Sequence, residues 1–530
     1  MSCICASMPT APLPLVPQPS HCQRRDGPDF VLGAATVIIT PTKFQATATL
    51  LAARIEAATS WKLNITTTAD GSTGSHIELR IGATGSDNPE SYTLKVNEQA
   101  AVITAPATAG AYYGCQTLLQ LFPAAIFSQA LRPDLVLTAP SVEITDTPRF
   151  QWRGVMVDSS RFYQPIAFLK KYVDLLSQHK INVFHWHLVD DQGWRLEIKK
   201  YPKLTSIGSK RRETIRGHGT NAFSGDGVPV EGFYTQDEVR DFVAYAAERH
   251  VQILPEIEMP GHAQSAIAAY PEYGLLPEAK PVSCIWGIHE TLYNVKPETF
   301  AFLEDVLTEV MDLFPFEYIH IGGDEAIKPQ WENDPDTQAR IKDLGLKDEH
   351  ELQSWFIRQA ETFLSKHGRK LVGWDEILEG GLAKSATVMS WRGIEGAIES
   401  AKHGNDAIMC PNPYVYFDHY QSDITNEPLC IGYHTPLDKV HSYEPIPTEL
   451  SAEQARHIIG VQGQLWSEYL PTTSRLEYMS FPRVCALAEI GWSPRERPDF
   501  PNFLTRLTGH LRRLDCQDVR YRAPLEYVKA

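Results

Sequence analysis

The chain has 530 residues, of which 43% are hydrophobic and 22% are charged, a composition typical of a folded globular protein and not of a disordered one. Its formal net charge of −16 repels phosphate backbones, and no basic run offsets that charge locally, which argues against nucleic acid as a partner. No apolar run reaches the roughly 18 residues that a membrane-spanning helix needs, so we expect no membrane partner.

Neither the cysteines nor the first residues of the chain identify the cellular compartment of the protein. The nine cysteines include no Cys-x-x-Cys pair, so neither a zinc ribbon nor a dense disulfide framework is predicted. The first 23 residues carry no charged side chain, but prolines interrupt them and no basic segment precedes an apolar one, so no signal peptide is predicted. The sequence as given therefore predicts a cytoplasmic protein, or a periplasmic or secreted one if its start lies upstream of Met1.

Residues 12–145 mix strand and helix patterns without regular alternation. The predicted elements are strands at 75–83, 91–95 and 100–104 and helices at 43–58 and 111–121. The last two strands flank a hairpin turn. This mixture predicts a small α+β accessory domain at the N-terminal end of the chain.

After Pro148, short apolar strands alternate with amphipathic helices. Eight strands are predicted, at 152–157, 182–188, 251–257, 318–321, 370–374, 387–391, 406–410 and 460–466. Between them, Thr235 and Glu238 form a capping box, and Pro165 and Pro297 occupy first-turn positions of helices. The repetition predicts a (β/α)8 TIM barrel over residues 146–500. Residues 501–530 are predicted to form a C-terminal helical segment that packs on the barrel.

Polar and aromatic side chains follow each of these predicted strands. In a barrel of this kind the active site is built at the carboxyl ends of the strands. The candidates, in chain order, are Arg161, Asp190, His262, His320 with Asp324 and Glu325, Trp374, Trp391, Tyr416 with Asp418, and Trp466 with Glu468. Indole faces pack on the C–H surfaces of sugar rings, while carboxylates and arginine bind hydroxyls, so this combination indicates carbohydrate chemistry.

Some of these motifs have alternative interpretations. A lone tryptophan is more often a core residue, but three of them at strand ends favour a pocket wall. His185-x-His187 places two imidazoles on one face of a strand, but no third ligand has recognisable spacing, so we predict neither a metal nor another cofactor. Gly322-Gly323 directly before Asp324-Glu325 suits a sharp turn where the backbone approaches a ligand.

The segment His320-Ile-Gly-Gly-Asp-Glu325, together with His187-Leu-Val-Asp-Asp-Gln-Gly-Trp194, resembles glycoside hydrolase family 20, the β-N-acetylhexosaminidases. The resemblance covers nearly the whole chain. It implies retaining, exo-acting hydrolysis of terminal β-linked N-acetylglucosamine or N-acetylgalactosamine. It further implies that the 2-acetamido group of the substrate is the nucleophile and that the intermediate is an oxazolinium ion, an exception to the usual two-carboxylate scheme.

The same resemblance assigns roles to the candidate residues. Glu325 is the general acid and later the base for water, Asp324 orients the acetamido N–H, and Tyr416 hydrogen-bonds the acetamido oxygen. The other implied substrate-binding residues are Arg161, Asp190, His262, Trp374, Trp391, Asp418, Trp466 and Glu468, with His320 in a supporting position behind them. The implied partner is a small-molecule or oligosaccharide substrate, and the oligomeric state is left open.

Three alternatives remain at this stage. One is a glycosidase whose own carboxylate, Glu256 or Glu258, attacks the sugar opposite Glu325. A second is a catalytically inactive sugar-binding homologue. The third is a disaccharide-releasing family member, similar to a lacto-N-biosidase, with a longer pocket.

Overall fold

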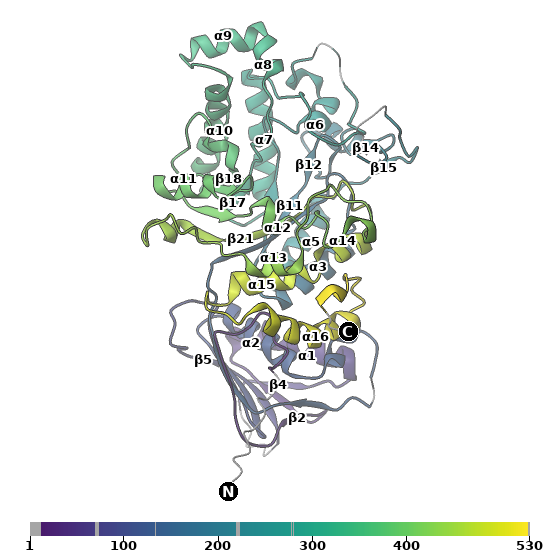
Figure 1. The fold of residues 1–530 in the computed structure, drawn as a ribbon, viewed down its shortest axis with the longest axis vertical. Coiled ribbons are helices and arrows are strands. Elements are labelled where there is room, and N and C mark those ends of the chain that lie inside the picture. The colour runs from purple at the N-terminus through teal and green to yellow at the C-terminus, as the bar shows by residue number, and fades with distance from the viewer. Residues whose placement is uncertain are drawn as a thin grey trace. The chain divides into compact units, whose positions relative to one another are not determined.

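The computed structural model describes residues 12–68, 74–132, 134–218, 223–276, 278 and 280–527 (Figure 1). Packing divides the chain into two units: Phe150–Gly491 form one, and the residues before and after that range form the other. Within the part of the chain that is described, no helix is both long and apolar enough to cross a membrane. The interpretation of the N-terminal leader falls mainly on residues 1–11, outside the described residues.

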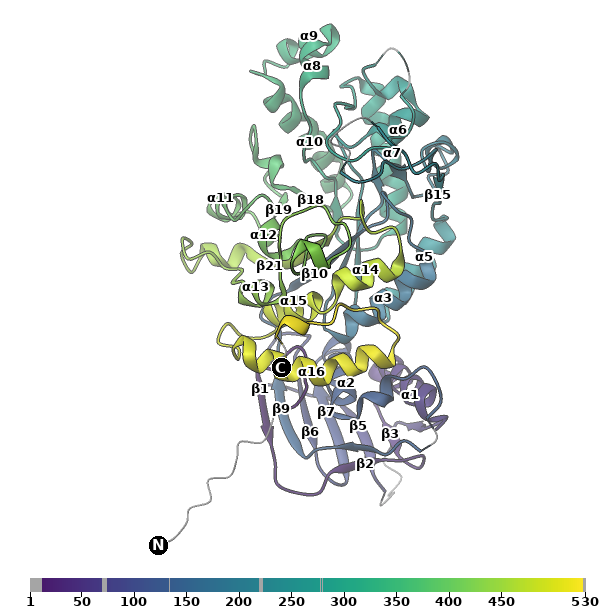
Figure 2. The same cartoon turned by 45° about the vertical axis from the view of Figure 1, so that its right-hand side comes forward.

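The N-terminal unit is built on a mixed seven-stranded sheet (Figure 2). In sheet order its strands are β1 (His21–Arg24), β9 (Val142–Asp146), β6 (Tyr92–Val96), β7 (Ala100–Ala105), β5 (His76–Ile81), β3 (Val37–Ile39) and β4 (Asn64–Thr66). Helices α1 (Gln45–Thr59) and α2 (Thr108–Leu121) accompany it, and β2 (Phe30–Leu32) pairs with β8 (Leu137–Ala139). The predicted hairpin is confirmed, because β6 and β7 pair antiparallel with Val96 opposite Ala101.

The C-terminal helix α16 (Phe500–Cys516) groups with this first unit. Its arginines explain the placement. Arg506 donates to the backbone carbonyl of Leu15 at 2.8 Å, and Arg513 donates to that of Pro14 at 2.6 Å. An amphipathic pattern predicts that a helix has a covered face but does not say which part of the fold covers it.

The second unit is a closed barrel of eight parallel strands, which confirms the predicted (β/α)8 fold. The strands are β10 (Trp152–Asp158), β11 (Val183–His187), β16 (Gln252–Glu256), β17 (Tyr318–His320), β18 (Lys370–Trp374), β19 (Thr387–Ser390), β20 (Ala407–Met409) and β21 (Ile458–Leu465). Nearly every residue of these strands is buried, as expected for parallel strands covered on both faces. All eight predicted strands lie within about two residues of the observed ones.

Most of the helices around the barrel connect consecutive strands, and the last two in the following list come after the final strand, β21 (Figure 1). They are α3 (Ile166–Gln178), α5 (Gln236–Ala247), α7 (Pro297–Leu313), α10 (Glu349–Lys366), α11 (Glu395–His403), α13 (Leu437–Ser442), α14 (Thr473–Ser480) and α15 (Arg483–Trp492). The capping box of Thr235 and Glu238 is present at α5, and Pro297 begins α7, whereas Pro165 is the residue before α3. The connection from β18 to β19, described in full, holds the 3-10 helix η4 (Asp375–Leu378) in place of an α-helix.

The loops that follow the carboxyl ends of the strands contain further helices and two-stranded ribbons. The helices are α4 (Lys203–Ser206), α6 (Gln264–Ala269), α8 (Pro329–Asn333), α9 (Pro335–Asp343) and α12 (Asn412–Val415). The two-stranded ribbons are β12 (Val189–Asp190) with β13 (Gly193–Trp194) and β14 (Lys210–Arg211) with β15 (Val230–Glu231).

The turn after β17 depends on two glycines in the left-handed region. Gly322 has a φ of +67°, and a Cβ there would lie 1.6 Å from Oε2 of Glu258. Gly323 has a φ of +93°, and its Cβ would lie 2.8 Å from a side-chain carbon of Ile377. The backbone at these two glycines closely approaches a buried carboxylate and an isoleucine side chain.

Replacing Gly322 by alanine should lower the thermal unfolding midpoint more than the same change at Gly368. Both residues have a left-handed φ, +67° and +72°, so each alanine costs about 1–2 kcal/mol of backbone strain. The new Cβ at position 368 enters open space, whereas the one at 322 must displace Glu258, which adds about 1–3 kcal/mol of overpacking. Thermal melts followed by circular dichroism measure the difference; equal midpoints would contradict the crowding at Gly322.

Candidate active site

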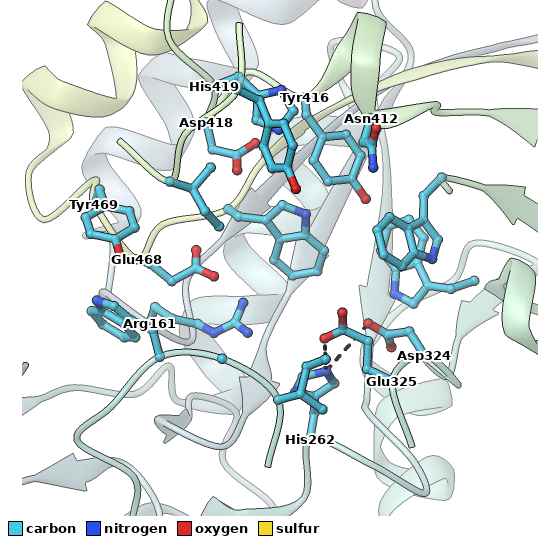
Figure 3. Close-up of a pocket in the computed structure, with 18 residues that line it drawn as sticks. Arg161, His262, Asp324, Glu325, Asn412, Tyr416, Asp418, His419, Glu468 and Tyr469 are labelled. Atoms are coloured by element: carbon cyan, nitrogen blue, oxygen red, sulfur yellow. Dashed lines mark ion pairs between the residues drawn. The ribbon is translucent and has the colours of Figure 1, made fainter. Parts of the chain in front are cut away.

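A pocket of about 330 Å³ opens among the loops that follow the barrel strands (Figure 3). Most of the predicted site residues line it: Arg161, His262, Asp324, Glu325, Trp374, Trp391, Tyr416, Asp418, Trp466 and Glu468. They are far apart in the sequence, and the barrel brings them together because its strands are parallel and end on one face. Two predicted residues, Asp190 and His320, do not line the pocket.

The Asp324-Glu325 pair lies at one side of the pocket beside His262 (Figure 3). Nε2 of His262 is 3.6 Å from Oδ2 of Asp324 and 3.5 Å from Oε2 of Glu325. Glu325 itself has a φ of +47°, an uncommon backbone conformation for a residue with a side chain. The turn made by Gly322 and Gly323 therefore delivers two adjacent carboxylates to one wall of the cavity.

Asp190, which the resemblance implies as a substrate-binding residue, is 1% exposed and does not line the pocket. Its carboxylate lies 2.7 Å from Nη2 of Arg161, 3.0 Å from Nε2 of His187 and 3.2 Å from Nδ1 of His262. Burial alone would raise the pKa of Asp190, but the charges of Arg161 and His262 outweigh it and hold the pKa well below the usual range. Asp190 thus fixes two pocket-lining cations.

His262 is a cation in this setting. Burial lowers its pKa, but the carboxylates of Asp190 and Asp324 outweigh burial and hold the pKa well above the ordinary histidine value. Nδ1 of His262 also lies 3.0 Å from Oδ2 of Asp191. Because Nδ1 contacts the carboxylates of Asp190 and Asp191, Nε2 faces the Asp324-Glu325 pair at the pocket wall.

Burial raises the pKa of two carboxyl groups, those of Asp324 and Glu258. Burial, with the charge of Glu325, raises the pKa of Asp324 to about 7, although His262 opposes the shift. Glu258 lies behind the pocket, and burial beside Asp324 and Glu256 raises its pKa well above the ordinary value. Neither oxygen of Glu258 has a hydrogen-bond partner among the described residues, which fits a neutral carboxylic acid.

A second buried carboxylate, Glu256, supports the opposite wall of the pocket. Its Oε1 accepts a hydrogen bond from Nε1 of Trp374 at 2.8 Å and lies 2.9 Å from Nδ1 of His320. Its Oε2 meets Nδ1 of His187 and lies 3.1 Å from Nε2 of His185. Burial would raise the pKa of Glu256, but the three histidines hold it well below the usual range.

The predicted supporting residue His320 is therefore part of this buried cluster under the pocket. His185, Glu256 and His320 are close enough together to share a cation. Their direct contacts with one another and with Trp374 give each residue a structural role, and we assign no metal to them.

Aromatic rings form the remaining walls. Trp374 and Trp466 lie with their ring centres 5.8 Å apart, and Trp391 stacks near Tyr416 at 6.2 Å. Nε1 of Trp391 donates to Glu376 at 2.9 Å, which fixes its indole plane. Glu376, two residues after Trp374, therefore supports a wall of the pocket.

Carboxylates and an arginine occupy the side of the pocket away from Asp324 and Glu325 (Figure 3). Asp418 is 4% exposed, and neither of its oxygens has a hydrogen-bond partner among the described residues. Burial and the nearby charge of Glu468 raise its pKa well above the ordinary value. The guanidinium of Arg161 lies 5.2 Å from the ring centre of Trp466. Unsatisfied polar groups next to an aromatic face suit a ligand with hydroxyls.

Several lining residues besides Gly287 were not predicted from the sequence. They are Trp286, Ile288, Asn412, His419, Ile431, Tyr433 and Tyr469. Most stand in long loops between the strands, where no periodicity predicts which side chains point inward. Tyr469 directly follows Glu468 and could have been found by extending the polar strand-end motif by one residue.

Replacing Glu258 by glutamine should flatten the pH dependence of stability. Because the folded-state pKa lies above the unfolded-state value, this residue's contribution to stability is present below the ordinary glutamate pKa and is lost as the pH rises toward the folded-state pKa. Glutamine keeps the shape and carries no charge, so the unfolding midpoint of the variant should fall less steeply as the pH rises from the ordinary glutamate pKa toward the folded-state pKa.

Thermal melts across that pH range measure the two slopes. The exposed Glu453→Gln is the matched control, since it makes the same chemical change on the surface of the same unit. A Glu258→Gln variant that keeps the wild-type slope would contradict the neutral form of this carboxyl group.

Comparison with known proteins agrees with this geometry. The model of glycosyl hydrolase family 20, catalytic domain, matches residues 150–495, and that of glycosyl hydrolase family 20, domain 2, matches residues 13–147. A β-hexosaminidase of Porphyromonas gingivalis is 44% identical over 96% of this chain, which spans 64% of that relative's length. A β-hexosaminidase of Vibrio furnissii is 35% identical, over 91% of this chain and 77% of the relative.

Solved structures give the same result. A GH20 exo β-N-acetylglucosaminidase from Vibrio harveyi in complex with N-acetylglucosamine has a TM-score of 0.84 at 33% identity, covering 98% of this chain and 80% of that one. A mutant Streptomyces plicatus β-hexosaminidase in complex with its product GlcNAc has a TM-score of 0.83 at 28% identity, covering 97% of each chain. With a catalytic-domain model matched across the whole barrel, this chain belongs to glycosyl hydrolase family 20.

Proposed function

We propose that this chain is a retaining, exo-acting β-N-acetylhexosaminidase that releases terminal β-linked N-acetylglucosamine or N-acetylgalactosamine from glycans, chitooligosaccharides or glycoconjugates. The observation that carries the proposal is the placement of the adjacent carboxylates Asp324 and Glu325 in one wall of an aromatic pocket of about 330 Å³. Family membership and the names of the relatives support the same activity.

In the first step, Glu325 gives its proton to the glycosidic oxygen while the acetamido carbonyl oxygen of the substrate attacks the anomeric carbon. The bond to the leaving group breaks, and an oxazolinium ion forms. Asp324 accepts the acetamido N–H, and its negative charge stabilises the positive ring. Tyr416 donates its hydroxyl hydrogen to the acetamido oxygen, so the nucleophile is held in line.

In the second step, Glu325 takes a proton from a water molecule, and the resulting hydroxide opens the oxazolinium ring at the anomeric carbon. Two inversions restore the original configuration. His262 is a cation 3.6 Å from Asp324, which favours the ionised form of that carboxylate when the positively charged intermediate is present. Trp374, Trp391 and Trp466 exclude water from the acetamido group until the leaving group has departed.

The alternative of an enzyme nucleophile receives no support from the positions of its candidates. Glu256 is fully buried and shared by three histidines, and Glu258 is buried behind Gly322. Neither of them lines the pocket. An inactive sugar-binding homologue is also disfavoured, because the acid, the orienting aspartate and the tyrosine all reach the same cavity.

Glu325→Gln should lower kcat by about 10²–10⁴-fold on N-acetylglucosaminides whose leaving groups need a proton. The loss should be much smaller on a dinitrophenyl glycoside, because that leaving group departs without protonation. Steady-state kinetics on the two substrates measure the ratio, with Glu453→Gln as the control. An equal loss on both would remove Glu325 from the role of general acid.

Exchange of the substrate's 2-acetamido group for a hydroxyl should abolish most turnover, with kcat/KM falling by at least about 10³-fold, because the intramolecular nucleophile is lost. The comparison uses nitrophenyl N-acetyl-β-glucosaminide and nitrophenyl β-glucoside with the same wild-type enzyme. Similar rates on the two sugars would show that the protein supplies the nucleophile.

A further inference from the structure

Two aromatic residues that the mechanism does not use, Trp286 and Tyr469, form a wall of the pocket. Both line the cavity, and their ring centres lie 6.4 Å apart at 64°. We call this pair the aromatic wall. Figure 3 shows Tyr469 next to Glu468 and Arg161, on the side of the pocket away from Glu325. The wall therefore lies on the side of the pocket opposite Glu325.

The side chain of Gln192 links the loop that contains Trp286 to Arg161 by hydrogen bonds. Nε of Arg161 donates to Oε1 of Gln192 at 2.8 Å, and Nε2 of Gln192 donates to the carbonyl of Ile285 at 2.9 Å. In the same loop, the backbone N–H of Ser283 donates to the carbonyl of Asp191 at 3.0 Å. The position of Trp286 is thus coupled to that of Arg161.

Further contacts hold the rings of the wall in place. The guanidinium of Arg211 lies 5.5 Å from the ring centre of Trp286 and donates to the backbone carbonyl of Arg161 at 2.5 Å. Phe162 packs edge-on against Trp286 at 6.0 Å. The Tyr469 hydroxyl lies 3.0 Å from Nδ1 of His218. These contacts join residues from the connections that follow β10, β11, β16 and β21, so the wall is part of the folded site.

We propose that the aromatic wall determines exo specificity by limiting the pocket to one terminal sugar. This inference rests on the proposed function, in which the leaving group departs on the Glu325 side and the far hydroxyls meet Arg161 and Glu468. A second sugar attached to one of those hydroxyls would occupy the space of Trp286 and Tyr469. The wall thus separates release of a monosaccharide from release of a disaccharide.

The test compares two kinds of nitrophenyl glycoside on wild type and Trp286→Ala. One carries N-acetylglucosamine alone, and the other carries N-acetylglucosamine capped with galactose at O3 or O4. The galactose has no 2-acetamido group, so a substrate-assisted enzyme cannot remove it first, and nitrophenol appears only if the disaccharide leaves intact. Trp355→Ala is the matched control, because Trp355 is also half-buried but lies outside the pocket, on α10.

Trp286→Ala should raise the ratio of kcat/KM on capped to uncapped substrate by at least about tenfold, and Trp355→Ala should leave it unchanged. An unchanged ratio in a folded Trp286→Ala protein, or efficient release of a disaccharide by wild type, would overturn the inference. If the wild-type protein is inactive on the uncapped glycoside, that result would instead overturn the proposed function.

A binding measurement separates the two failures without turnover. Calorimetric titration of free N-acetylglucosamine and of the galactose-capped disaccharide into wild type should show binding of the first only. The same titration into Trp286→Ala should show binding of both. A disaccharide that binds wild type as tightly as the monosaccharide would exclude the wall as a barrier.

Discussion

The pairing of buried charges around Asp190 is the constraint on which the pocket depends. An ion removed from water costs several kcal/mol unless opposite charges and hydrogen bonds compensate it. Asp190 faces three cationic or protonatable groups at once: Arg161, His187 and His262. Two of these groups line the pocket, so the same contacts that make burial tolerable also fix the directions in which Arg161 and His262 meet a ligand.

His187 connects this centre to the second one at Glu256. One nitrogen of its ring meets Asp190 and the other meets Glu256, and these carboxylates outweigh burial and raise the pKa of His187 to about 10. Glu256 in turn holds the indole of Trp374. The pocket residues Arg161 and His262 therefore share one buried network with the indole of Trp374. The pocket is organised before a substrate arrives, as electrostatic stabilisation of a transition state requires.

The fold was predictable because parallel barrel strands are buried on both faces and appear in the sequence as continuous apolar runs. Residues immediately after those runs, such as Asp324 and Trp466, were predictable for the same reason. Asp190 stands at the same strand ends but does not line the pocket, because sequence position does not reveal which carboxylate faces the cavity and which faces a neighbouring arginine. Trp286 lies in a long loop without periodicity, and its inward direction depends on Gln192 and Arg211, contacts that no local pattern encodes.

The left-handed backbone at Glu325 has a consequence for directed evolution. A non-glycine residue in this conformation costs about 1–2 kcal/mol, and among the described residues the Glu325 carboxylate has an ion pair with His262 at 3.5 Å but no hydrogen bond to offset that cost. Glycine at this position would relieve the strain. A library selected only for heat resistance would therefore enrich the loss of the proposed acid, so such a selection needs a parallel screen for turnover.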